Sequence, residues 1–252
     1  MPSCVSILEY DPELAEDLSD DDLAIARPQL VADVRRYARG TWTFDPDDFD
    51  HVANLGLLIV KGLLARRVTV GDHTSAELLG PGDVLQPWLL IDADQSVAVQ
   101  VGWEVLQPVQ AAMLHRRFCA LADKWPEIKA AISRRIVRRA HRLAFQLAIC
   151  NLRPLDDRLL LVLWQLADRL GKVTPEGVLL DFPLTHDLLA AMVGARRPSV
   201  SVAVGRLTDQ GQVRPRPRSR WLLLEQPPAE LQERHERESG SRGSSSKETA
   251  DA

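Results

Sequence analysis

The spacing of apolar positions changes along the chain and predicts a β-rich segment between two helical ones. Residues 12–39 are expected to be helical, with Ser19 as the N-cap and Gly40 as the stop. Between residues 41 and 107, short apolar runs alternate with turn residues such as Lys61-Gly62. Many short strands with frequent turns are typical of a β-sandwich, a jelly roll or a small barrel.

Residues 108–150 return to a helical pattern. After Pro126, apolar side chains recur at steps of three and four, which predicts one helix of about 24 residues and roughly 36 Å. We interpret this stripe as the seam of a homodimer, and packing on the helix's own domain is the alternative. The arginines on the other faces are interpreted as solvated rather than as a DNA site. The predicted seam consists of Ile132, Ile136, Ala140, Leu143 and Leu147.

Two short helices are expected between residues 183 and 211. Thr185 is placed to cap the first helix, and Gly194 permits a tight turn with a positive φ after it. Pro198 lies in the first turn of the second helix, where its missing N–H costs nothing. Two short helices joined by a short turn with glycine are typical of a helix-turn-helix. The buried face of the second helix is expected to be Val200, Val204 and Leu207.

The segments around these helices complete a small domain. A helix over 155–170 and a strand over 178–182 come before them, and Val213 and Leu222–Leu224 can pair as a hairpin after them. The hairpin loop would form a wing that offers cations to phosphates or to a minor groove. A solvated loop after an ordinary helical hairpin is the alternative. The loop contains Arg214, Arg216, Arg218 and Arg220.

Charge is unevenly distributed along the chain, although the formal net charge is only −4. The first 50 residues carry thirteen acidic and four basic side chains, whereas residues 181–225 carry seven arginines and four acids. This asymmetry predicts that the C-terminal part faces a polyanion. The three cysteines are far apart and form no metal-binding spacing, and neither a signal pattern nor a spanning apolar run is present. We therefore expect a cytoplasmic protein without a metal and without membrane contact.

Residues 184–211 resemble the helix-turn-helix of the Crp/Fnr regulators. The resemblance extends upstream through 155–170, and more weakly to Gly56–Leu64 and Leu79–Asp83 in the β-rich part, so that it spans most of residues 40–226. It implies a homodimeric regulator of transcription that binds double-stranded DNA through recognition helices about 34 Å apart. It also implies a cyclic-nucleotide-binding-like β-roll and a long dimer helix.

The resemblance carries roles over to individual positions. Arg197 matches the arginine that reads a base and can donate two hydrogen bonds to a guanine. Pro198 and Val202 stand where many members have an acid and a second arginine, so the operator is expected to differ from the usual family site. The predicted DNA-binding residues are Thr185, Arg196, Arg197, Ser199, Ser201, Arg206, Arg216, Arg218 and Arg220.

The ligand motifs of the family's nucleotide sensors are absent. Gln86-Pro87 stands in place of a Gly-Glu pair, and Gln95-Ser96-Val97 in place of a motif whose arginine pairs with the cyclic phosphate. Cyclic nucleotide is therefore not expected as a cofactor. The β-roll either binds another small apolar effector of unknown identity or serves only as a dimer scaffold.

The prediction is an α+β fold with a β-roll or jelly roll, a dimerisation helix and a C-terminal winged helix-turn-helix, in a protein that is not an enzyme. One alternative is a protein-interaction module that has lost DNA binding, and another is a cupin-type metalloenzyme, for which His51 and His73 are too isolated. The acidic N-terminal segment either contacts RNA polymerase or only shields the chain. The expected domains are 1–40 (acidic helical segment), 41–110 (sensor), 111–153 (dimer helix and hinge), 154–226 (DNA binding) and 227–252 (disordered tail).

Overall fold

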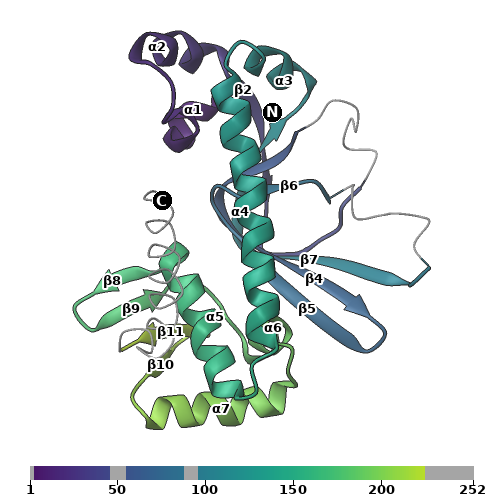
Figure 1. Cartoon of the computed structure of the whole chain (residues 1–252), viewed down its shortest axis with the longest axis vertical. Coiled ribbons are helices and arrows are strands. Elements are labelled where there is room, and N and C mark those ends of the chain that lie inside the picture. The colour runs from purple at the N-terminus through teal and green to yellow at the C-terminus, as the bar shows by residue number, and fades with distance from the viewer. Residues whose placement is uncertain (1–2, 46–54, 88–95, 225–252) are drawn as a thin grey trace, which may run out of the picture. The chain divides into compact units, whose positions relative to one another are not determined.

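The computed structural model describes residues 3–45, 55–87 and 96–224 (Figure 1). The predicted tail over 227–252 and the positions of His51 and Gln95 lie outside these residues. The chain divides into two units, which are residues 1–151 with 190–194, and residues 152–189 with 195–252.

The first unit is built on an antiparallel sheet of seven strands. The main path through the sheet is β1-β2-β7-β4-β5, with β3 paired to β7 and β6 paired to β4. The strands are β1 (Ser3–Ser6), β2 (Val31–Tyr37), β3 (Gly40–Trp42), β4 (Gly56–Val70), β5 (His73–Leu79), β6 (Val84–Leu85) and β7 (Val99–Leu114). The helices are α1 (Ile7–Tyr10), η1 (Pro12–Ala15), α2 (Asp20–Gln29), α3 (Arg116–Ala122) and α4 (Pro126–Cys150).

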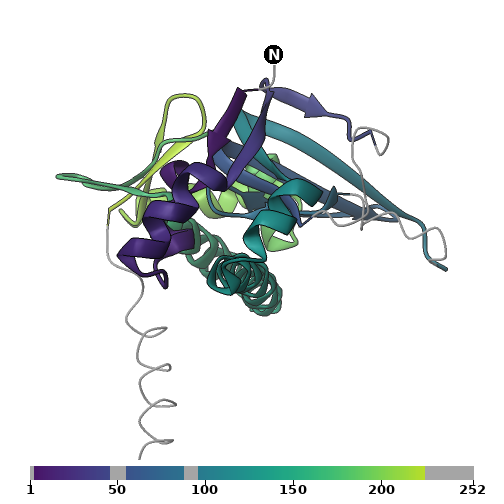
Figure 2. The same cartoon turned by 90° about the horizontal axis from the view of Figure 1, so that it is seen from above.

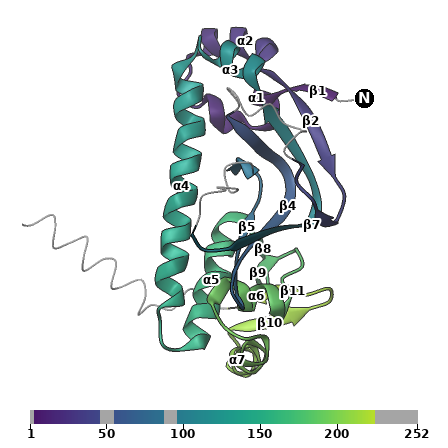
Figure 3. The ribbon, with the colours of Figure 1, turned by 90° about the vertical axis from the view of Figure 1, so that its right-hand side faces the viewer.

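Alternation along β4 and β7 divides the buried side chains between the two faces of this sheet. Leu58 pairs in register with Ala112, and both belong to the cluster that includes helix residues from α3 and α4. Their neighbours Leu57 and Ile59 belong to a second cluster, which includes the aromatic ring of Trp103. Figure 3 shows α4 running along one face of the sheet, and Figure 2 shows the helix end-on at that face.

The sequence predicted several strands and helices wrongly. Residues 31–37 form β2 instead of the end of a helix, and β2 pairs with β7, so the N-terminal segment contributes strands to the sheet beside its short helices. Gly40 begins β3 instead of ending a helix. Residues 108–114 are the end of β7 and not helical. Lys61-Gly62 lies inside the long strand β4, at a register shift opposite β7.

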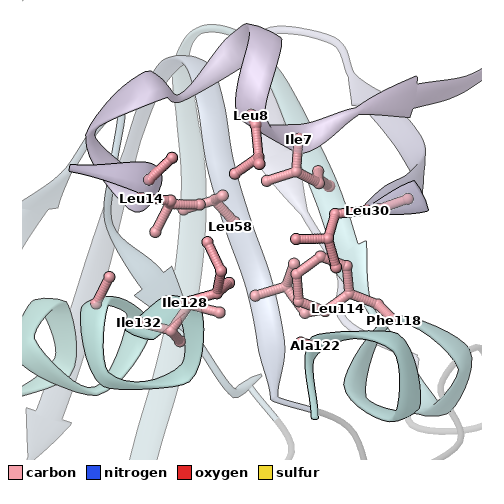
Figure 4. Packing of buried hydrophobic residues seen from close by; sticks show 14 of the residues in the cluster. Ile7, Leu8, Leu14, Leu30, Leu58, Leu114, Phe118, Ala122, Ile128 and Ile132 are labelled. Atoms are coloured by element: carbon pink, nitrogen blue, oxygen red, sulfur yellow. The ribbon is translucent and has the colours of Figure 1, made fainter. Parts of the chain in front are cut away.

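The long helix α4 has 25 residues and begins at Pro126, as the sequence predicts. Its first half packs against the sheet, where Ile128 and Ile132 lie close to Leu58 and Leu14 (Figure 4). Ile132 is only 1% exposed. The prediction that Ile132 lies in a dimer seam was therefore wrong, because this side chain already belongs to the core of its own unit.

The second unit contains the remaining helices, except for residues 190–193 of α6, which belong to the first unit, and a small antiparallel sheet of order β10-β11-β9-β8. The helix over 155–170 has the predicted bounds, and the two short helices follow as the sequence predicts. The elements are α5 (Leu155–Leu170), β8 (Lys172–Thr174), β9 (Gly177–Leu180), α6 (His186–Val193), α7 (Arg197–Asp209), β10 (Val213–Arg216) and β11 (Arg220–Leu223).

Candidate nucleic-acid interface

The helices α6 and α7 are held by local signals that the sequence identified. The Thr185 hydroxyl accepts a hydrogen bond from the backbone N–H of Leu188 at 3.1 Å, which caps α6. Gly194 has a φ of +64° in the turn between the helices. The predicted inner face of α7 is confirmed, because Val200, Val204 and Leu207 are all at most 4% exposed.

The exposed side of α7 carries the predicted base-reading residue. Arg196 is the residue before the helix and Arg197 its first residue, and both are exposed. Within the described residues, neither guanidinium forms an ion pair. Ser199 and Ser201 are also exposed, and the Ser201 hydroxyl lies 2.8 Å from His186 Nδ1 and donates to the carbonyl of Arg197 at 3.2 Å. The partnership with His186 was missed, because fifteen residues separate the two positions and no local pattern joins them.

Several of the predicted DNA-binding arginines are already paired within the unit. Arg206 donates to both carboxylate oxygens of Asp156 on α5, at 2.7 and 2.5 Å. This hydrogen bonding raises the pKa of Arg206. Arg216 forms an ion pair with Glu176, and Arg220 donates to Asp181 at 2.7 Å. In the absence of DNA, these three arginines therefore connect elements of the domain through ion pairs.

Arg218 differs from the other wing arginines. It lies in the turn between β10 and β11 and is exposed, and among the described residues it has no ion-pair partner. Arg218 and Ser219 have φ angles of 62° and 55°. These angles lie in the left-handed region, which residues other than glycine seldom adopt. The turn therefore holds a cation at the tip of the hairpin in a strained backbone conformation.

The wing is attached to the segment that leads into α6. The backbone N–H of Leu184 donates to the Ser219 carbonyl at 2.8 Å, and the Trp221 indole N–H donates to the Leu184 carbonyl at 2.8 Å. Trp221 is 2% exposed. These two bonds fix the hairpin beside residue 185, so the wing and the start of α6 are held together.

Asp181 lies where β9 leads toward α6 and receives two cations. Lys172 Nζ donates to Asp181 Oδ2 at 2.8 Å, and Arg220 Nη1 donates to Oδ1 at 2.7 Å. Hydrogen bonds from Lys172 and Arg220 lower the pKa of this carboxyl. The group stays ionised at neutral pH and keeps Arg220 in place.

A face of α4 is apolar and exposed within its own unit. Four of its apolar side chains are 42–66% exposed, namely Ile136, Val137, Phe145 and Leu147. Of the other predicted seam positions, Ala140 is exposed and Leu143 is half-buried. Ile136, Ala140 and Leu147 fall in one row along the helix, and an exposed apolar row on a helix roughly 37 Å long is typical of an interaction surface.

Three arginines of α4 face the β-sheet instead of solvent. Arg135 donates to both carboxylate oxygens of Asp11, at 2.5 and 2.6 Å, and to the Gly82 carbonyl at 3.1 Å. Arg139 donates to Glu77 at 2.6 Å, and Arg142 pairs with Asp83. The prediction of a solvated arginine face was wrong for these three residues. Burial raises the pKa of Asp11, and Arg135 opposes that effect.

The interior of the β-roll contains a small apolar cavity. Pro87 stands at the position that the resemblance gives to the sensors' ribose-binding glutamate, and the side chain of Gln86 before it donates to the Leu55 carbonyl at 3.2 Å. The other sensor position, residue 95, lies outside the described residues. The cavity is lined by Tyr37, Trp42, Leu57, Ile59, Leu64, Leu85, Val105, Val109 and Ala111.

No metal or membrane site is found in the described part of the chain. Within residues 3–45, 55–87 and 96–224, no group of three or more His, Cys, Asp or Glu side chains could hold a metal ion. His73 is almost fully exposed, and its Nε2 lies 3.4 Å from the Asp72 carboxylate. None of the helices in these ranges is both long and apolar enough to cross a bilayer.

The geometry of α6, α7 and the wing agrees with the sequence comparison. Residues 157–233 match the family of the Crp-like helix-turn-helix domain. This part of the chain is a Crp-like helix-turn-helix domain. A comparison with curated proteins gives no match.

The fold of the chain is similar to solved structures of Crp/Fnr transcription regulators. A CRP/FNR-family regulator from Thermus thermophilus has a TM-score of 0.56 and 18% identity over 76% of this chain and 93% of its own. A CooA variant from Carboxydothermus hydrogenoformans has a TM-score of 0.58 and 17% identity over 89% of this chain and 94% of its own. The c-di-GMP-responsive regulator CLP of Xanthomonas campestris has a TM-score of 0.55 and 17% identity over 77% of this chain and 95% of its own.

Proposed function

We propose that this protein is a homodimeric, sequence-specific DNA-binding regulator of transcription of the Crp/Fnr type. The observation that carries the proposal is the pair Arg196 and Arg197, exposed at the start of α7 and without ion pairs among the described residues. An arginine at the beginning of a recognition helix can donate two hydrogen bonds to guanine O6 and N7. Arg218 at the wing tip supplies a further cation for a phosphate or a minor groove.

The ion pairs within the domain divide the proposed DNA-binding arginines into those without a carboxylate partner among the described residues and those with one. Arg196, Arg197 and Arg218 are the primary contacts, with Thr185, Ser199 and Ser201 beside them. The paired arginines at 206, 216 and 220 hold the domain in shape, and each would have to leave a carboxylate before it could bind a phosphate.

A substitution at Arg197 tests this assignment. Arg197→Ala should weaken binding to a specific duplex by about 1–3 kcal/mol and leave binding to random duplex nearly unchanged. Arg206→Gln is the matched control, because it removes one positive charge from the same helix at a residue already paired with Asp156. Equal affinity for specific and random duplexes, both before and after Arg197→Ala, would contradict the proposal.

A second copy of this chain is the proposed partner of the exposed face of α4. Ile136, Ala140 and Leu147 form an exposed row that flanks the side of the helix with the sheet-facing arginines. Ile136→Glu should convert the dimer to a monomer in sedimentation analysis. Arg138→Glu is the control, because a residue two positions away does not share the face of Ile136. A dimer that survives Ile136→Glu and Leu147→Glu together would contradict this interface.

The β-roll is proposed not to respond to cyclic nucleotide. Neither Gln86 nor Pro87 can supply a carboxylate to a ribose hydroxyl, and the described cavity is lined by apolar side chains. A small apolar effector suits these walls better than a charged one. Calorimetric titration with cyclic AMP should give no heat of binding, and saturable binding would contradict the proposal. No observation favours a catalytic role, and the similar solved structures named above are regulators.

A further inference from the structure

The outermost line of α7 is unusual for a helix that reads bases, because it presents hardly any polar groups. Positions 198, 202, 205 and 209 are spaced by four, three and four, so they form one ridge along the helix. This outer ridge consists of Pro198, Val202, Gly205 and Asp209, and all four residues are exposed. It lies opposite the buried face, and it is the part of α7 that would lie deepest in a major groove.

Val202 occupies the middle of the outer ridge and is 60% exposed. Pro198 has no backbone N–H to offer and Gly205 has no side chain, so no hydrogen bond to a base edge can come from either. Nothing lies within 4 Å of a Cβ built on Gly205, which leaves open space for close approach beside Val202. Asp209 lies at the far end of α7, where its negative charge disfavours phosphates.

The neighbouring polar side chains replace the missing hydrogen-bonding groups of the outer ridge only in part. The Ser201 hydroxyl is engaged with His186 and with the Arg197 carbonyl. Arg197 lies one turn or more before Val202, and Arg206 is held by Asp156. Ser199, three residues before Val202, is exposed, but Val202 itself can contact a base only through its apolar side chain.

In the major groove, the thymine C5-methyl is the apolar group that marks a base. We propose that Val202 reads a thymine methyl group in each half-site and is a specificity-determining residue of this protein. Single exposed apolar residues are ordinary on protein surfaces. Val202 differs because it lies at the centre of a ridge that has no hydrogen-bonding group before Asp209. The proposal rests on the proposed function, since it requires α7 to enter a major groove.

Replacement of thymine by deoxyuridine tests the proposal, because it removes only the methyl group. The probe is the duplex that the wild-type protein enriches from random DNA, with each thymine of one half-site replaced in turn by deoxyuridine. One replacement should weaken binding roughly fourfold, which corresponds to the loss of about one buried methyl group. The remaining replacements should change the affinity less than twofold.

The variant Val202→Ala completes a cycle with the modified duplex. Alanine is a better helix former than valine, so the exposed helix should be retained. In Val202→Ala, the fourfold loss caused by the sensitive deoxyuridine should disappear. Arg197→Ala is the comparison, in which the same fourfold loss should remain.

Three results would overturn the proposal, and they are distinguishable. If the wild type binds the enriched duplex tightly but no deoxyuridine weakens binding, Val202 does not read a methyl group, and the proposed function as a DNA-binding regulator is retained. The same holds if the loss persists in Val202→Ala. If no duplex is enriched by a protein that is dimeric in solution, the proposed function fails and this inference fails with it.

Discussion

Replacement of Arg135 is predicted to lower the stability of the first unit strongly, because it leaves the Asp11 carboxylate buried without its cation. The Arg135 side chain is 8% exposed and that of Asp11 is 11% exposed. Arg135 also donates to the Gly82 carbonyl, so it joins α4 to the N-terminal segment and to the turn before β6. Loss of one partner of a buried ion pair destabilises a protein by about 3–5 kcal/mol. For a unit of this size, that corresponds to a fall in Tm of roughly 6–20 °C for Arg135→Met.

The pH dependence of this loss has a defined sign. Burial raises the pKa of Asp11, and without Arg135 it should rise further. A carboxyl group whose pKa is higher in the folded than in the unfolded state destabilises the fold as pH rises through that folded value. The destabilisation by Arg135→Met should therefore be larger at neutral pH and should decrease as the pH falls toward the pKa of Asp11.

Calorimetric melting of the wild type, Arg135→Met, Asp11→Asn and the double variant tests this account. The double variant should be more stable than Arg135→Met alone, because no buried charge is left unpaired. Arg138→Met is the control, since Arg138 is an exposed arginine of the same helix. The reasoning is refuted if Arg135→Met costs less than about 1 kcal/mol, or if the two single effects simply add.

Three further predictions concern the DNA-binding unit. Trp221→Phe removes the indole donor to the buried Leu184 carbonyl and should cost about 1–3 kcal/mol in thermal unfolding; an unchanged Tm would contradict the role of this bond. Arg220→Gln should raise the pKa of Asp181 toward its ordinary value, as carboxyl NMR can measure. An unchanged pKa would show that Arg220 does not lower the pKa of Asp181. Ser219→Gly should stabilise the wing by roughly 0.5 kcal/mol, since glycine adopts a positive φ readily; a lower Tm would show that the turn is not strained.

The DNA-binding unit could be predicted closely because its signals are local. An N-cap at Thr185, a turn glycine at 194 and a proline in the first turn of α7 each act within a few residues of their own position. The same holds for Pro126 at the beginning of α4. Such signals do not depend on distant partners, so the sequence alone was sufficient.

Long-range pairing explains the errors. Residues 31–37 resemble the end of a helix, but they become a strand because β7 supplies its hydrogen-bonding partner. Gly62 resembles a turn, yet the strand continues through it at a register shift. At φ +90° any Cβ there would lie 2.1 Å from the Pro108 carbonyl oxygen, so close backbone approach requires glycine.

The arginines of α4 and α7 were harder to assign than their helices. Arg135 finds Asp11 at a separation of 124 residues, and Arg206 finds Asp156 at a separation of 50. Periodicity identifies the face on which an arginine lies but not the acid that meets it. The predicted DNA contacts therefore included Arg206 and Arg220, whose ion pairs only the three-dimensional arrangement reveals.

Selection of bound sites from random duplex DNA at near-physiological salt is the most direct test of the central claim. The purified full chain should enrich a two-fold symmetric motif whose half-sites lie about 10 base pairs apart, as two recognition helices in successive major grooves require. Absence of any enriched motif, from protein shown by sedimentation to be dimeric, would contradict the claim that this chain is a sequence-specific DNA-binding regulator.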